Sequence, residues 1–239
     1  MQTDPVRPTC NICGGNAFRT LNGRENARCA KCLSFERTRV MKLLMDRAGI
    51  PKTGAKTLHI APEPGLAKYL QEVCGENYRP VDLDSERYAF CKAEKFDLTT
   101  DAEELESGIY DLVIHSHVME HIPCDETAVL LHLHRSLNAD GVHIVSIPIF
   151  PGYYGSDLKP LSADEAIARF HQFDHVRRFG LVNLAQTFGM VFKLPATYDI
   201  VTEFGEETLR AHAIPEAAWR GFSGHSVFLF RKGDCKFAV

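Results

Sequence analysis

The chain has 239 residues, of which 45% are hydrophobic and 24% are charged, and its formal net charge is −4. This length exceeds that of one average domain, and the hydrophobic content suffices for a globular core. No apolar run approaches the roughly 20 residues of a membrane span, and the first ten residues lack a signal-peptide core. We therefore expect a cytoplasmic protein with no membrane partner, whose eight cysteines are not paired in disulfides.

Four cysteines near the amino terminus form two Cys-x2-Cys pairs, Cys10 with Cys13 and Cys29 with Cys32. Each pair places two thiolates on one turn, and two pairs supply the four tetrahedral ligands of a structural Zn²⁺ ion. A redox Cys-x2-Cys normally occurs singly, beside a strand and a helix. We therefore predict a zinc-ribbon module over residues 1–35, which could not fold on its own core without the metal.

The next segment predicts a connection between this module and a larger domain. Residues 36–48 (ERTRVMKLLMDRA) predict a helix with an apolar face. Residues 49–54, which include Pro51, predict a joint, so we assign residues 36–55 to a linking helix and joint. The main domain is then expected over residues 56–239.

In the main domain, short apolar strands alternate with helical runs. This alternation predicts an α/β fold in which helices wrap a parallel sheet and the ligand lies at the carboxyl ends of the strands. Two long inserts, 149–180 and 195–224, are expected to form substrate walls or lids, because long connections in compact domains are usually functional. The seven predicted strands are 56–60, 78–84, 94–100, 110–116, 141–148, 190–194 and 225–233, with a helix at 181–187.

Acidic residues mark the ends of the early strands and identify a class of ligand. The first turn holds one glycine, Gly65, two prolines and the carboxylate of Glu63. A dinucleotide site needs several glycines, and the carboxylate of Glu63 would repel the pyrophosphate of a dinucleotide. The same carboxylate would attract the sulfonium or ammonium group of S-adenosylmethionine, which has no phosphate. Asp82 can accept hydrogen bonds from both ribose hydroxyls, and Asp97 from the adenine amine. Each acid alone could equally be a helix cap or a solvated loop residue.

Several motifs resemble those of a known family. They are LHIAPEPGL (58–66), VDLD (81–84), FDLTT (96–100), DLVIHSHVMEHIP (111–123), LHRSLNADGVHIVSIPI (133–149), DHVRRFG (174–180) and the amino-terminal RENARCxxCxSxER pattern at 24–37. The chain resembles class I S-adenosylmethionine-dependent methyltransferases, in particular a bacterial group with a four-cysteine amino-terminal module. It departs from that group at Ala-Asp-Gly (139–141) and at His171, where the group usually has glycine.

The resemblance implies a Rossmann-like class I methyltransferase fold with a seven-stranded sheet, and a cofactor site at the strand ends. The cofactor contacts that we expect are Ala61, Pro62, Glu63, Gly65, Asp82, Leu83, Asp97, Leu98, His115, Ser116, His117 and His121.

The first insert carries the candidate catalytic residues. Methyl transfer from a sulfonium requires an aligned acceptor and, for a hydroxyl or amine, removal of its proton, for which histidine is the usual base. We predict His175 as this group, oriented by Asp174. His171, Asp174 and His175 could instead bind a metal ion, or Asp174 and His175 could only pin the insert. The expected substrate-binding residues are Tyr153, Tyr154, His171 and Arg177.

The predicted function is S-adenosylmethionine-dependent methylation of an oxygen or nitrogen atom of a small molecule or saccharide. Residues 1–50 hold nine Lys and Arg against four Asp and Glu, which gives +5 and leaves −9 for the rest of the −4 chain. An RNA methyltransferase that holds nucleic acid with this module is therefore an alternative. The zinc thiolates would reduce the excess to about +3, below that of a typical nucleic-acid domain. A non-catalytic S-adenosylmethionine-binding module is the second alternative, although it should have lost Asp82 and Asp97.

Overall fold

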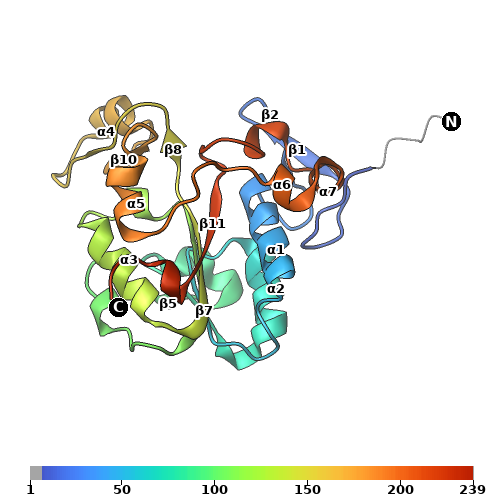
Figure 1. The fold of residues 1–239 in the computed structure, drawn as a ribbon, viewed down its shortest axis with the longest axis horizontal. Helices are drawn as coiled ribbons and strands as arrows, with labels where there is room; N and C mark the ends of the chain where they lie inside the picture. Colours follow the sequence, from blue (N-terminus) through green and yellow to red (C-terminus); the bar gives the residue numbers. More distant parts are fainter. Residues whose placement is uncertain (1–6, 239) are drawn as a thin grey trace.

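The computed structural model describes residues 7–238 and is built around a six-stranded sheet (Figure 1). The two strands at one edge, β11 and β7, are antiparallel, and all other neighbours are parallel. This arrangement confirms the predicted α/β fold with a mostly parallel sheet. In sheet order the strands are β11 (Val227–Arg231), β7 (Leu137–Ser146), β6 (Tyr110–Ser116), β3 (Thr57–Ile60), β4 (Tyr78–Asp82) and β5 (Glu94–Lys95).

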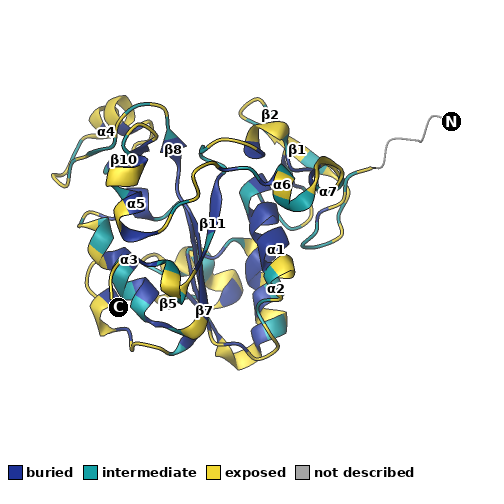
Figure 2. Ribbon diagram, viewed as in Figure 1, coloured by how far each residue is buried: buried dark blue, intermediate teal, exposed yellow. Residues whose placement is uncertain are grey.

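Helices cover both faces of this sheet. Figure 1 shows α1 (Glu36–Ala48) and α2 (Pro64–Cys74) on one side, and α3 (Glu126–Arg135) and α5 (Phe188–Val191) on the other. All four residues of β3 are buried, as expected for a central parallel strand enclosed on both faces. Buried residues also form most of α1, which Figure 2 shows in dark blue beside β11. The helix predicted to link two parts of the chain is thus a component of the main core.

The predicted count of seven strands is wrong by one among the described residues. Residues 190–194 are not a strand, since α5 extends into them and Phe192 makes only an isolated bridge to Cys235. The helix expected at 181–187 is a single 3₁₀ turn, Leu184–Gln186. A short apolar run cannot distinguish a strand from a buried helix end. Phe192 is buried by stacking on Phe230, with ring centroids 4.3 Å apart, so no further strand is needed to cover it.

The amino-terminal module is a small hairpin with two cysteine-bearing turns. Its strands are β1 (Phe18–Leu21) and β2 (Arg24–Cys29). The second turn leads directly into α1, so the module is continuous with the helix that packs on the sheet. None of the described helices has both the length and the apolar character required to cross a bilayer.

The two inserts have different surroundings. The first forms a small sheet, in the order β8 (Ile149–Phe150), β10 (Arg177–Gly180), β9 (Gly155–Ser156), together with α4 (Ala163–Phe170). The second contains α6 (Val201–Phe204) and α7 (Glu206–Ala211), which lie beside β1 and β2 in Figure 1.

Hydrogen bonds fix the second insert to the amino-terminal module. The Thr9 amide donates to the Ala211 carbonyl at 2.7 Å, and the buried Arg39 guanidinium donates to the carbonyls of His212 and Ala213. These contacts join residues more than 170 positions apart. The second insert therefore packs on the cysteine module, whereas the first lies over the end of β6.

Candidate active site

Strained backbone marks the carboxyl edge of the sheet. Ala61, directly after β3, has φ 51°, and His117, directly after β6, has φ 53°. Residues with a side chain rarely adopt this left-handed conformation, and such outliers cluster at ligand sites. Because β3 and β6 are neighbouring parallel strands, the two outliers lie at one edge. This edge is where the sequence places the cofactor.

Glu63, in the turn after β3, is held by the start of α1. Its carboxylate pairs with the Arg37 guanidinium at 3.0 Å and accepts a hydrogen bond from the Thr38 hydroxyl. Arg37 also donates from Nε to the Ser116 hydroxyl at 2.9 Å. The charge of Glu63 is thus already balanced, and Arg37 links the ends of β3 and β6. The sequence analysis gave Arg37 no role, although the motif at 24–37 ends on it.

The amino-terminal module touches the same turn. A side-chain Cβ at Gly65 would lie 2.9 Å from the Cys32 Sγ and 3.0 Å from the Cys32 carbonyl oxygen. These separations are too short for any residue but glycine without a backbone shift. Gly65 therefore gives close packing between the second cysteine turn and the first turn of α2.

The two strand-end acids each use one oxygen locally. The Asp82 Oδ1 accepts from the Asp84 amide at 2.8 Å, and burial raises the pKa of Asp82. The Asp97 Oδ1 accepts from the amide and the hydroxyl of Thr99, at 2.9 and 2.7 Å. Each carboxylate keeps a second oxygen for a ligand, and their assignment to ribose and adenine remains a prediction. Leu83 is exposed and Leu98 buried.

The predicted contact of His115 with the cofactor does not agree with the position of its side chain. It is fully buried, its ring centroid lies 5.0 Å from that of His143, and neither of its ring nitrogens has a hydrogen-bond partner among residues 7–238. Side chains alternate along a strand, so Ser116 faces Arg37 while His115 points to the opposite face of the sheet.

Buried histidines should make the protein acid-labile. Desolvation lowers the pKa of both His59 and His115 to about 3, against 6.5 for the free side chain. Between these values the unfolded chain binds protons that the folded chain cannot, so stability is complete above about pH 6.5 and falls as the pH drops toward 3. Each group contributes about 1.4 kcal/mol of stability per pH unit across that range.

We expect the double variant His59→Gln, His115→Gln to show a smaller loss of melting temperature between pH 7 and 5 than the wild type. Thermal unfolding followed by circular dichroism measures this loss. His132→Gln, on the surface side of α3, is the matched control and should keep the wild-type slope. An unchanged slope in the double variant would contradict the assignment.

A second group of polar side chains lies where the first insert meets the segment after β6. The His121 Nδ1 is 3.3 Å from the Asp174 Oδ2, and the rings of His121 and His175 are in an edge-on contact with centroids 4.7 Å apart. The His175 Nδ1 is 3.1 Å from the Phe170 carbonyl oxygen. The predicted pairing of Asp174 with His175 is therefore wrong, because the Asp174 carboxylate lies against His121.

Glu120, at the centre of this group, was missed by the sequence analysis. Only 1% of its surface is exposed, and burial raises the pKa of Glu120 to about 8. Its Oε1 lies 3.6 Å from the His117 Nδ1 and 4.0 Å from the His121 Nε2, while its Oε2 has no hydrogen-bond partner among the described residues. The only sequence signal is its place between histidines in SHVMEHIP.

The predicted substrate contacts have different outcomes. Arg177 is fully buried, donates to the carbonyls of Met119 and Cys124, and pairs with Glu126 at 3.2 Å, so its prediction as a pocket residue is wrong. It instead fixes the segment that carries Glu120 and His121. Tyr154 packs against Phe179, whereas the Tyr153 side chain is 64% exposed. His171 ends α4 with φ 72° and contacts Phe150, outside the Glu120 group.

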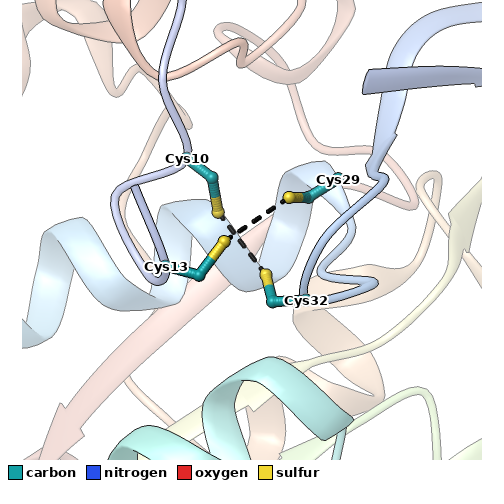
Figure 3. A group of neighbouring side chains, drawn as sticks. All are labelled: Cys10, Cys13, Cys29 and Cys32. Atoms are coloured by element: carbon teal, nitrogen blue, oxygen red, sulfur yellow. Dashed lines mark hydrogen bonds between the residues drawn. The ribbon is translucent and has the colours of Figure 1, made fainter. Parts of the chain in front are cut away.

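The four amino-terminal cysteines converge (Figure 3). The Sγ atoms of Cys10 and Cys32 are 3.6 Å apart, as are those of Cys13 and Cys29. Four Zn–S bonds of about 2.3 Å in a tetrahedron would separate the sulfurs by about 3.8 Å. The donor set and spacing therefore fit a closed zinc site without rearrangement of the backbone.

Comparison with known proteins finds one matching family model, over the middle of the chain. Residues 63–145, from the turn after β3 into β7, match a family model described as a methyltransferase domain. The comparison with curated proteins gives no match. The matched segment contains α2, β4, β5, β6 and α3 and covers less than half of the chain. This part of the chain is similar to a methyltransferase domain.

Several solved structures of methyltransferases are similar to the chain at low sequence identity. An S-adenosylmethionine-dependent methyltransferase from Mesorhizobium loti aligns over 47% of this chain and 57% of its own, with 17% identity and a TM-score of 0.38. One from Archaeoglobus fulgidus aligns over 81% and 92%, with 16% identity and a TM-score of 0.46. The 1,6-didemethyltoxoflavin-N1-methyltransferase of Burkholderia thailandensis aligns over 68% and 69%, with 16% identity and a TM-score of 0.46.

Proposed function

We propose that the enzyme binds S-adenosylmethionine across the ends of β3, β4 and β6 and transfers its methyl group to an oxygen or nitrogen atom of a small molecule or saccharide. The observation that carries the cofactor assignment is the turn after β3. Pro64, at the first position of α2, has no amide hydrogen, and Glu63 lies directly before it. Gly65 is covered by Cys32. A pyrophosphate would find few free amides and a carboxylate here, whereas S-adenosylmethionine carries no phosphate.

Asp82 and Asp97 are proposed to bind the nucleoside, with Ala61, Pro62, Leu83 and Leu98 beside them. Ser116, His117 and the Arg37–Glu63 pair would border the amino-acid part of the cofactor. Arg37 bonds Ser116 and Glu63 at once, so it would keep the two strand ends at a fixed separation.

The acceptor is proposed to lose its proton at the group formed by Glu120, His121, Asp174 and His175. Methyl transfer needs the acceptor in line with the departing sulfur, and a hydroxyl or ammonium acceptor must also be deprotonated. The contact between Asp174 and His121 makes this pair part of the proposal, in place of Asp174 with His175 alone. Tyr154 and His171 are proposed to line the acceptor side.

The contacts of the basic side chains in residues 1–50 support a small-molecule acceptor over RNA. Of the nine Lys and Arg in residues 1–50, seven contact other groups of this chain, and Arg37 and Arg39 are largely enclosed. Such residues do not form a free basic surface for phosphates. The seven are Arg24 (Glu36), Arg28 (Phe35), Lys31 (Cys13 carbonyl), Arg37 (Glu63), Arg39 (carbonyls), Lys42 (Asp46) and Arg47 (Glu203).

Calorimetry tests the cofactor part of the proposal. We expect S-adenosylmethionine and S-adenosylhomocysteine each to bind with one site per chain, and NAD to give no heat of binding. Formation of S-adenosylhomocysteine is then measured with panels of hydroxylated small molecules, amines, saccharides and total RNA. Binding of NAD would contradict the cofactor assignment. Turnover with RNA alone, lost as salt is raised, would establish the alternative acceptor.

A further inference from the structure

The group after β6 has the geometry of a metal-ligand set. A ligand oxygen of Glu120 and ring nitrogens of His121 and His175 all lie within 4.8 Å of one another. The backbone holds the two segments together, because the Val176 amide donates to the Glu120 carbonyl at 2.9 Å. Metal bonds of about 2.0–2.2 Å would bring the three ligand atoms to about 3–3.5 Å, so side-chain rotations of about 1 Å would close the set.

Hydrogen bonds fix which ring nitrogens are free. The Nδ1 of His121 faces the Asp174 carboxylate and carbonyl, both at 3.3 Å, and the Nδ1 of His175 faces the Phe170 carbonyl at 3.1 Å. All these partners are acceptors, so in the neutral ring each Nδ1 carries the proton and each Nε2 keeps its lone pair. A metal-binding histidine typically donates its second N–H to a carboxylate or carbonyl in this way. Both rings thus have the tautomer that a metal ion requires.

The Glu120 carboxyl supplies independent support. It is almost fully buried, and in the part of the chain that the structure describes its Oε2 has no hydrogen-bond partner. A buried polar atom without a partner costs free energy, and a buried carboxylate costs more unless it is paired or coordinates a metal. The Arg177 side chain, which is directed to carbonyls and Glu126, does not pair with it. A cation held by Glu120, His121 and His175 would give this carboxylate a charged partner.

We propose that Glu120, His121 and His175 bind one divalent transition-metal ion, such as Mn²⁺, Fe²⁺ or Zn²⁺, at the end of β6. Two imidazoles and one carboxylate suit these ions and leave coordination positions open. Asp174 orients His121 as a positioning residue. This ligand set differs from His171, Asp174 and His175, because His171 lies outside it. The site is separate from the four cysteines, whose thiolates form a closed set.

The ion would also define the acceptor, a consequence that rests on the proposed function. A substrate hydroxyl bound to the open position would have its pKa lowered by the ion and release its proton to solvent. The alkoxide oxygen would then bond to the methyl carbon as the carbon–sulfur bond breaks, which turns the sulfonium into the neutral thioether of S-adenosylhomocysteine. The histidines would act through the ion and not as free bases. Oxygen acceptors are therefore favoured over amines.

Titration with Mn²⁺ tests the site, with the enzyme carrying one equivalent of zinc on its cysteines. Free Mn²⁺ is followed by electron paramagnetic resonance, because the hexaaquo signal decreases on binding. We expect one Mn²⁺ per chain with a micromolar Kd. Glu120→Gln and His175→Ala should each weaken binding at least 10-fold while the cysteine zinc is retained, as measured by elemental analysis. His121→Ala, on a partly exposed side chain, provides a third variant if a buried substitution prevents folding.

The control is His171→Asn, in the same insert, since asparagine tolerates the left-handed backbone at that position. It should bind Mn²⁺ like the wild type. Absence of submillimolar binding in the wild type, or equal binding by the wild type and the ligand variants, would overturn the proposal. Calorimetry with S-adenosylmethionine separates the two claims. Cofactor binding without a Mn²⁺ site would refute only the metal inference, and a Mn²⁺ site without cofactor binding would refute only the proposed function.

Discussion

Replacing Cys29 with serine is expected to remove zinc and to unfold the amino-terminal module. The module has few buried residues of its own, and the binding free energy of a structural zinc ion, about 10–16 kcal/mol in small zinc modules, is largely folding free energy. The loss should extend further, because Cys32 packs against Gly65 at the start of α2 and Arg39 joins the module to the second insert.

Elemental analysis and thermal unfolding measure this outcome. The wild type, purified without chelators, should contain one zinc per chain, and Cys29→Ser should contain none and melt at least 10 °C lower. Cys124→Ser is the matched control, a half-buried thiol outside the module, and should keep its zinc. Well under half an equivalent of zinc in the fresh wild-type protein would contradict the prediction.

Replacing Asp82 with alanine is expected to weaken S-adenosylmethionine binding by about 1.5–3 kcal/mol, or roughly 10- to 150-fold. This range is that of hydrogen bonds to a charged group. The Asp84 amide donates to one oxygen of Asp82, and no described residue donates to the other. This second oxygen lies at the end of β4 in a partly buried setting, which strengthens a hydrogen bond to a ligand.

The neighbouring acid provides the control for this experiment. Asp84→Ala removes the same charge two residues later, but its side chain accepts from the Arg87 amide and caps the following 3₁₀ turn. Calorimetry should therefore find Asp84→Ala within a few-fold of the wild type. If Asp84→Ala loses affinity and Asp82→Ala does not, the ribose contact lies at Asp84.

The helical and strand pattern of the first half could be predicted because it depends on local spacing. The strand ends that carry Asp82 and Ser116, the turn at Glu63 and the helix at 36–48 all follow from short-range periodicity and turn residues. Residues 190–194 were wrongly predicted as a strand, because α5 extends into them. The apolar residues of this segment suit a strand or a buried helix end equally, and packing of Phe192 on Phe230 decided between them.

Partners of charged side chains were predicted least well. Asp174 and His175 are adjacent in the sequence, yet the Asp174 carboxylate reaches His121, 53 residues away. Arg177 was predicted to bind the substrate. It is instead buried, where it donates to the Met119 carbonyl and pairs with Glu126 in the segment after β6. The sequence does not distinguish a solvent-exposed charged residue from a buried one, because burial depends on the elements that pack around it.

By itself, the sequence determined the class of fold, the convergence of four cysteines and the acidic ends of the early strands, because each depends on spacings within one turn, strand or helix. Only the tertiary structure decided what those elements enclose. It placed Arg37 between Glu63 and Ser116, covered Gly65 with Cys32, and buried Glu120 between two histidines. These contacts join segments 26 to 79 residues apart in the first case, and they form only when the helices and the first insert pack on the sheet and exclude water.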